Sequence, residues 1–250
     1  MNSTSNIGMA IITLITILNS TLSAQQKPNY EVGINIGTLV YQGDLTASAF
    51  GSYQQLKPAV GLTVSKHLSS HFALCANLLF GKIGADESQM KSPAFKQYRN
   101  FKFSTSVTEL STVLVWNALG ESIDKYYRKI SPYVFAGAGL TFLDVKRDWG
   151  RINTSFFDTK STAIIGLGID TLHNTPKILP IIPIGAGVNY AITNCIGIKA
   201  EATYRFTFSD YVDGFKYAAN PTSLDSYYGL SLGISLKLGN NSFRCPTLKL

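Results

Sequence analysis

The chain has 250 residues and a formal net charge of +7, with 45% hydrophobic, 12% aromatic and only 15% charged residues. Its basic residues are scattered along the sequence, so they form no continuous stripe of the kind that nucleic-acid binding requires. We therefore expect no nucleic-acid partner, and the length suits one all-β domain behind a short N-terminal segment.

Residues 1–24 are typical of a cleaved secretory signal peptide. The segment carries no charged side chain, has an apolar run over 7–18, and ends on small residues up to Ala24. The run is too short for a spanning helix, which needs roughly 20 apolar residues. We expect a signal peptide at 1–24 and an outer-membrane β-barrel domain at 25–250, with a short periplasmic C-terminal tail.

The clearest strand signal is the segment 198–209. Apolar residues alternate there with polar ones, which places the two sets on opposite faces of a β-strand. A strand of this length suits a tilted bilayer crossing of about 9–11 residues better than a soluble strand of about 5–6. The apolar face, from Ile198 to Phe208, is expected to contact lipid, and the polar face, from Lys199 to Thr207, to face a lumen.

Seven further segments show strand-like alternation: 30–41, 59–68, 71–83, 99–116, 130–143, 182–192 and 227–238. Short joins at 68–71 and 193–195 alternate with long joins, and 117–129 is intermediate. Outer-membrane barrels combine short periplasmic turns with long extracellular loops. The pattern predicts an all-β fold, an eight-stranded antiparallel transmembrane β-barrel with an OmpA- or OmpX-like up-and-down meander. Both termini would lie in the periplasm, and segment 161–170 could pair locally and extend the barrel above the membrane.

A soluble lipocalin-like barrel is the alternative, because it also has eight up-and-down strands. It would turn the bulky Tyr204, Phe206 and Phe208 inward and the glycine-rich face toward water. Glycine crowding fits a narrow lumen better than a solvated surface. The sequence therefore favours a bacterial outer-membrane location with lipid as the surrounding partner.

The lumen of an eight-stranded barrel is only wide enough to be filled by side chains. Buried charges must be paired, so both signs are expected together. The hypothesis is that Arg205 and Lys199 pair with Glu201 and Glu109, in a structural filling rather than a gated ion path. The candidate interior positions are Glu31, Asn35, Asn77, Lys102, Glu109, Lys199, Glu201 and Arg205.

Enzymatic chemistry has little support in the sequence. His67 and His71 flank a proposed periplasmic turn and His173 lies in a long loop, and none has a partner at a spacing that implies a triad. A metal site at His67 and His71 lacks a third ligand. We expect no enzymatic activity, no catalytic residue, no cofactor and no metal. A narrow passive porin or a ligand-binding surface barrel is the alternative function, and a lipid-modifying enzyme is the least favoured.

The cysteines and one loop give two further predictions. Cys195 precedes the seventh strand and Cys245 follows the eighth, so both would lie at the periplasmic rim, where a disulfide can form; Cys75 is read as a buried filler. Asp210 and Asp213, around Tyr211, could form a partner-facing or cation-binding rim. Alternatively, they begin a loop whose Asp side chains bond to its own backbone.

The chain resembles a small outer-membrane β-barrel family of Bacteroidota that includes the PorG-type component of the type IX secretion system. The resemblance implies a structural role: the secretion-system member anchors periplasmic ring proteins, so secretion-ring or other envelope proteins are expected partners. This chain has Gly214 where the family pattern continues with a second Asp. The motifs are G-x-x-x-Y-x-G-D-L at 37–45, Glu109–Leu110, S-P-Y-V-F-A-G-A-G at 131–139, P-I-G-A-G at 183–187, Asp210, Tyr211 and Asp213 within 205–213, and C-P at 245–246.

Overall fold

The computed structural model describes residues 30–46, 48, 51, 55–90, 93–120, 129–193, 195–220 and 224–238. Eight strands, each paired antiparallel with the next, form a closed barrel, and β1 pairs with β8 to close it. The predicted eight-stranded antiparallel barrel is confirmed. The proposed signal peptide at 1–24 lies outside the described residues. The strands are β1 (Tyr30–Gln42), β2 (Lys57–His67), β3 (Phe72–Asp86), β4 (Lys102–Asn117), β5 (Ile130–Asp148), β6 (Ile178–Ala191), β7 (Ile196–Ser209) and β8 (Asp225–Leu238).

The strands present apolar side chains outward and polar side chains inward. On β7, Ile198 and Phe206 are exposed, whereas Arg205 and Thr207 are buried. The same arrangement on the other strands gives a continuous exposed apolar belt, far larger than soluble monomers normally expose. A soluble lipocalin-like barrel would have the opposite polarity, so this alternative is wrong. The outer face is suited to a bilayer.

Several strands extend further than the sequence pattern predicted, and β5 and β6 extend the most. β5 continues to Asp148, and beyond Phe142 its outward side chains change from apolar to the polar Asp144 and Lys146. β6 begins at Ile178 despite the prolines within it, and its ladder with β5 is interrupted between Ile181 and Ile184. The interruption accommodates proline, which cannot donate a ladder hydrogen bond.

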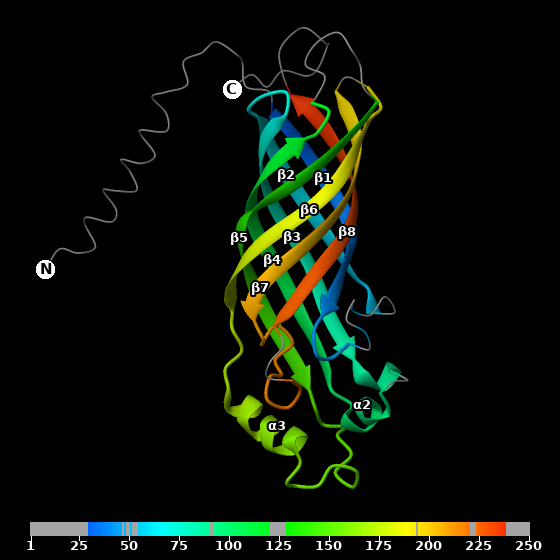
Figure 1. Cartoon of the computed structure of the whole chain (residues 1–250), viewed down its shortest axis with the longest axis vertical. Helices are drawn as coiled ribbons and strands as arrows, with labels where there is room; N and C mark the ends of the chain where they lie inside the picture. Colours follow the sequence, from blue (N-terminus) through cyan, green and yellow to red (C-terminus); the bar gives the residue numbers. More distant parts are fainter. Residues whose placement is uncertain are drawn as a thin grey trace, which may run out of the picture.

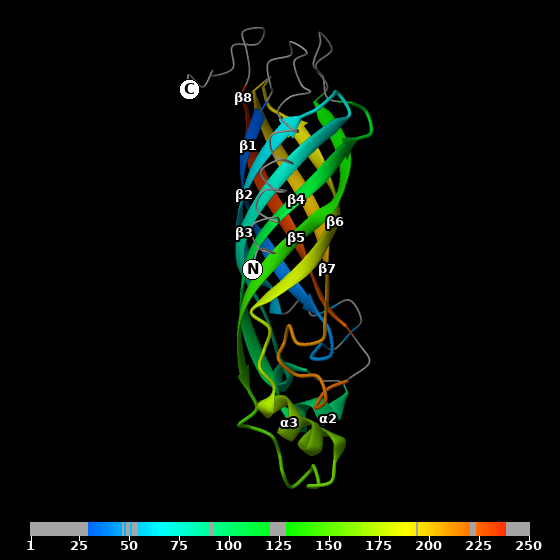
Figure 2. The ribbon, with the colours of Figure 1, turned by 90° about the vertical axis from the view of Figure 1, so that its left-hand side faces the viewer.

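The described parts of the long joins hold three short helices at one end of the barrel: η2 (Glu87–Gln89), α2 (Ala94–Arg99) and α3 (Thr162–Leu172). Figures 1 and 2 show α2 and α3 beyond the barrel end opposite the start of β1. The expectation that 161–170 extends the barrel as strands is wrong, because Ser161 caps a helix by accepting from the Ile164 backbone. No helix in the described residues is long and apolar enough to cross a membrane.

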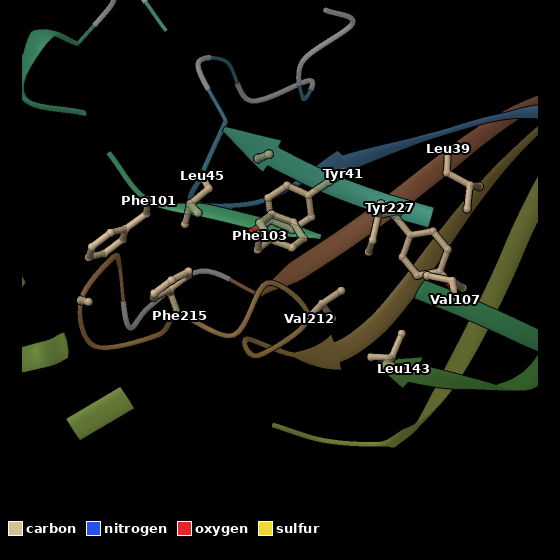
Figure 3. Packing of buried hydrophobic residues seen from close by; sticks show 13 residues of the cluster. Leu39, Tyr41, Leu45, Phe101, Phe103, Val107, Leu143, Val212, Phe215 and Tyr227 are labelled. Carbon is tan, nitrogen blue, oxygen red and sulfur yellow. The ribbon is translucent and has the colours of Figure 1, made fainter. Parts of the chain in front are cut away.

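The larger buried hydrophobic cluster lies inside the loop end of the barrel and in the loops beyond it (Figure 3), and a smaller one, at Cys75, Val113, Tyr133 and Phe135, lies inside the barrel. We call the larger cluster the mouth cluster, and it continues the strand interior into the loops. It consists of Leu39, Tyr41, Leu45, Ile83, Ala85, Phe101, Phe103, Val107, Leu143, Val212, Phe215, Ala218 and Tyr227.

Candidate functional site: the lumen and its closed mouth

A buried ion pair crosses the middle of the lumen. Arg205 on β7 donates from Nε to Oε2 of Glu109 on β4, at 2.5 Å, and both side chains are almost fully buried. Ser111 donates to the other oxygen of Glu109 at 3.1 Å. The structure therefore brings together two of the four charged residues that the sequence placed in one network.

The other two members of the predicted network have different partners. Lys199 forms an ion pair with Glu31, and Nε2 of His67 lies 3.5 Å from the same carboxylate. Glu201 accepts a hydrogen bond from the Tyr133 hydroxyl at 2.7 Å. The pairing of Lys199 with Glu201 or Glu109 is thus wrong.

The order of the strands explains why Lys199 pairs with Glu31 rather than with Glu201 or Glu109. β8 lies between β7 and β1, and it contributes the small Gly233 and Ser235 to the inner face. These residues leave room for Lys199 to reach Glu31 across the strand between them.

Lys102 is not an interior residue. Its side chain is 55% exposed, and its Nζ lies 3.1 Å from Oδ2 of Asp86, its pairing partner across the β3–β4 ladder. The interior assignment is wrong because β4 begins at Lys102, at the loop end and with this side chain outward. Asn35 and Asn77, in contrast, do line the lumen.

The remaining space in the lumen is small. A cavity of about 90 Å³ runs along the interior, with the Arg205–Glu109 pair among its lining residues, which is room for a few water molecules. Inward glycines admit aromatic rings: a Cβ at Gly187 would lie 2.6 Å from Cζ of Tyr133. The lumen is therefore filled by side chains, as the strand number predicts.

The loop between β7 and β8 closes the mouth. We call residues 210–219 the plug. β7 turns into the plug through a β-bulge, where Phe208 has a φ of 55°, in the left-handed region that such a side chain rarely adopts. Val212 and Phe215 then enter the mouth cluster, Phe215 stacks on Phe101 at 4.5 Å, and Thr105 donates to the Val212 carbonyl at 2.9 Å.

The predicted acidic rim is buried in the plug. Asp213 is fully buried and accepts from the Phe215 backbone at 2.8 Å, and Asp210 is only 4% exposed. Burial and the nearby Asp225 carboxylate raise the pKa of Asp213 well above its usual value. Burial and Asp44 raise the pKa of Asp210 to about 7. An exposed rim of carboxylates is thus wrong, and the backbone-bonding alternative describes Asp213.

Tyr211 is a plug residue whose side chain contacts α3 and the residue after it. Its hydroxyl is 3.4 Å from Oδ1 of Asp170, and its ring stacks on His173 with centroids 4.3 Å apart. Burial and the Asp170 carboxylate raise the pKa of Tyr211 to about 12. Tyr211 therefore contributes to docking the plug against the helix.

Buried polar groups of the other loops hold the plug from outside. Asp170 of α3 accepts three plug backbone N–H groups, at 2.9 to 3.2 Å. Arg147 donates to the carbonyls of Gly214 and Asp170, at 2.8 Å each. Arg99 of α2 forms a buried ion pair with Glu87 and donates to the Ala218 carbonyl at 3.0 Å. The β3–β4 loop, the β5–β6 loop and the end of β5 therefore meet on one plug.

Sequence reasoning missed these supporting residues. Glu87, Arg99 and Asp170 lie in long loops, and Arg99 ends α2 although the alternating pattern placed it at the start of a strand. Their partners in the plug are far away along the chain: Arg99 contacts Ala218, and Asp170 contacts 216–218. The available signal was chemical: Asp and Arg inside apolar loop segments must find buried partners.

The described residues show no candidate metal site, and they contain one half of a disulfide. They contain no group of three or more His, Cys, Asp or Glu side chains that could hold a metal ion. Cys195 is disulfide-bonded, whereas Cys75 is a buried free thiol. Cys245, the predicted partner of Cys195, lies outside the described residues, so the Cys195–Cys245 pairing stays a prediction.

Residues 8–235 match the family described as "Domain of unknown function (DUF6089)". The chain belongs to the DUF6089 family. The match covers every strand of the barrel except the last residues of β8. A comparison with curated proteins finds no match for this DUF6089 chain.

Solved structures similar to the DUF6089 barrel include known outer-membrane proteins. Ail of Yersinia pestis, in complex with the heparin analogue sucrose octasulfate, is 11% identical at a TM-score of 0.44, over 85% of this chain and 99% of Ail. Neisserial surface protein A is 13% identical at a TM-score of 0.43, over 83% of this chain and 96% of that protein. The outer-membrane enzyme PagL is 13% identical at a TM-score of 0.36, over 82% of this chain and 98% of PagL. At such low similarity, these likenesses assign no activity to the chain.

Proposed function

We propose that the chain is an integral outer-membrane barrel that serves as a non-conducting structural anchor of an envelope complex. The observation that carries the proposal is the closed mouth. The plug fills the loop end with apolar side chains, and the Arg205–Glu109 pair crosses the lumen behind it. A transport role needs a continuous polar path, and this arrangement supplies none.

The membrane assignment rests on the outer face of the barrel. The outward residues of all eight strands form the apolar belt, and a closed barrel leaves no unpaired strand edge in lipid. Among bacterial membranes, the outer membrane is where such barrels reside. The membrane partner is accordingly the lipid of the outer membrane.

The more specific role is a scaffold for type IX protein secretion. Its support is the set of motifs shared with the family that includes the PorG-type component. On this proposal, the end with the short turns faces the periplasm, together with both termini. Periplasmic ring proteins of the secretion machine would bind there. We also propose that the chain has no enzymatic activity.

Site-specific photo-crosslinking in living cells tests the proposed orientation and role. A crosslinking amino acid replaces Leu68, which is 53% exposed in a short turn, or the exposed Arg151 at the loop end as the matched control. We expect crosslinks to periplasmic envelope proteins from position 68 and not from position 151. Deletion of the gene should also reduce secretion of proteins to the cell surface.

The opposite outcomes separate the alternatives. Normal secretion after deletion would exclude the secretion role while leaving a general anchor role open. Crosslinks from position 151 alone would favour a ligand-binding surface barrel. An altered lipid composition that depends on the protein would favour a lipid-modifying enzyme.

A further inference from the structure

We propose that the plug is locked in the barrel mouth by one proton shared among Tyr41, Asp213 and Asp225, so that the closure loosens as the pH rises. Tyr41 and Asp225 belong to the barrel wall, on β1 and β8, whereas Asp213 belongs to the plug. All three residues are almost completely buried within or beside the mouth cluster. The trio therefore joins the plug to the barrel wall.

A count of hydrogens shows why a proton must be bound. The hydroxyl oxygen of Tyr41 lies 2.7 Å from Oδ2 of Asp213 and 2.5 Å from Oδ1 of Asp225. A phenol has one hydrogen and can donate to only one of these carboxyl groups. The other carboxyl oxygen can approach at hydrogen-bond distance only if it carries a hydrogen and donates to Tyr41.

The remaining carboxyl oxygens already have donors. Oδ1 of Asp213 accepts from the Phe215 backbone at 2.8 Å, and Oδ2 of Asp225 accepts from the Val212 backbone at 3.0 Å. The extra hydrogen therefore lies between Tyr41 and the two carboxyl groups. Because the same carboxyl groups accept from the Val212 and Phe215 backbones, a change in their protonation acts directly on the backbone of the plug.

No cation compensates the two carboxyl groups within the part of the chain that the structure describes. Lys216 lies 3.9 Å from Asp210 instead, Lys96 donates to the carbonyls of Asp44 and Thr46, and Arg147 donates to the Gly214 and Asp170 carbonyls. Three further carboxylates lie near the trio or its plug, so the surroundings favour a bound proton. The acidic and basic groups around the trio and plug are Asp44, Lys96, Arg147, Asp170, His173, Asp210 and Lys216, together with the Glu87–Arg99 pair, whose Arg99 donates to the Ala218 carbonyl.

The direction of the pH effect follows from linkage. Burial and Asp225 raise the pKa of Asp213, so the closed plug holds a proton that a solvated plug releases. Closure is then strongest below the pKa of a solvated Asp and is lost as the pH rises through the raised pKa. For one released proton, the ratio of open to closed plug rises about tenfold per pH unit in that range.

Trp149 provides a reporter for this opening. Its ring packs edge-on against Phe215 of the plug, with centroids 6.3 Å apart, and it borders the mouth cluster. The chain has only one other tryptophan, Trp116, which is 45% exposed on the outer face. A Trp116→Phe background therefore leaves fluorescence that reports on the plug alone.

The experiment measures acrylamide quenching of Trp149 in the full chain reconstituted in phospholipid nanodiscs, from about pH 5 to about pH 9. We expect quenching to increase along a one-proton titration. Asp213→Asn supplies a permanent N–H donor to Tyr41, so its quenching should stay low throughout. Asp144→Asn, which removes a 70% exposed carboxylate of β5, should titrate like the background protein.

Two results would overturn the proposal. One is quenching that does not change with pH in the background protein; the other is the same titration in Asp213→Asn. Circular dichroism and heat-modifiable gel migration check that the barrel is folded. Should Asp213→Asn fail to fold, Asp225→Asn provides the second test. It supplies a permanent N–H donor to Tyr41 from the wall side, so its quenching should also stay low throughout, and a titration like that of the background protein refutes the proposal.

Discussion

Arg205 and Glu109 show how a single pair determines the polarity of the barrel interior. Two opposite charges that meet at 2.5 Å deep in the lumen satisfy each other, whereas either one alone is a buried uncompensated charge. This is why the alternating polar face of β7 can point inward without a water-filled channel.

Arg205→Leu should therefore lower the free energy of unfolding by about 3–5 kcal/mol, because it leaves the Glu109 carboxylate buried without its partner. The double variant Arg205→Leu with Glu109→Leu should lose clearly less. Urea unfolding in detergent micelles, followed by tryptophan fluorescence, measures both. Equal losses in the single and double variants would show that the pair is not coupled.

The cysteines give a second test at the scale of single residues. The Lys237 backbone donates to the Cys195 carbonyl at 2.7 Å, so the end of β8 lies beside the turn that carries Cys195. A disulfide from Cys195 to Cys245 should leave one free thiol, that of Cys75. Thiol labelling of the denatured, unreduced protein counts these groups, and three labelled thiols would contradict the pairing.

At the scale of elements, the plug is held by α3 through Asp170. Asp170→Ala removes the acceptor of three plug N–H groups, and each buried donor left unsatisfied costs about 1–3 kcal/mol. We expect faster proteolytic cleavage within 210–219 and unchanged circular dichroism from the strands. The exposed Asp158→Ala is the control and should behave like the wild type. Equal protection in both variants would mean that α3 does not stabilise the plug.

The strands could be predicted from the sequence, whereas the closure of the mouth by the plug could not. The period-two pattern of 198–209 predicts β7 because lipid and lumen lie on opposite sides of every barrel strand. The same reasoning failed for 161–170, where a local cap at Ser161 and packing on the plug favour a helix. The lumen residues could be assigned to the interior, but partner choice depends on the small residues of β8, which no single-strand pattern encodes. Tyr41 and Asp225 are far apart in sequence, so only the closed barrel brings them together.

At the scale of the whole molecule, the apolar belt must match the depth of the bilayer. Ala138 and Asp144 point outward on the same strand, Ala138 within the belt and Asp144 beyond it. Ala138→Arg should cost about 2–4 kcal/mol of folding free energy in lipid, and Asp144→Arg about 0–1 kcal/mol. Folding titrations into phospholipid vesicles measure both values. Equal costs would place the membrane boundary elsewhere on the barrel.

The lumen and mouth together make the molecule a closed barrel rather than a channel. Polar side chains and ion pairs fill the lumen of the barrel, and the plug closes the loop end together with the rest of the mouth cluster. Two loops and the end of β5 converge on this seal, which is more structure than a permanently open pore would need. The closure is therefore the property on which the proposed anchor role depends.

Single-channel recording in planar lipid bilayers tests this closure most directly. At about pH 6, the full chain should insert without steady conductance. A variant that combines a short glycine–serine linker in place of 212–218 with Arg205→Ala and Glu109→Ala should conduct, because it lacks both the plug and the ion pair that crosses the lumen. Gel migration of the heated and unheated protein confirms that both forms are folded. A large, stable conductance of the unmodified chain under these conditions would contradict the closed-barrel account and support a passive porin.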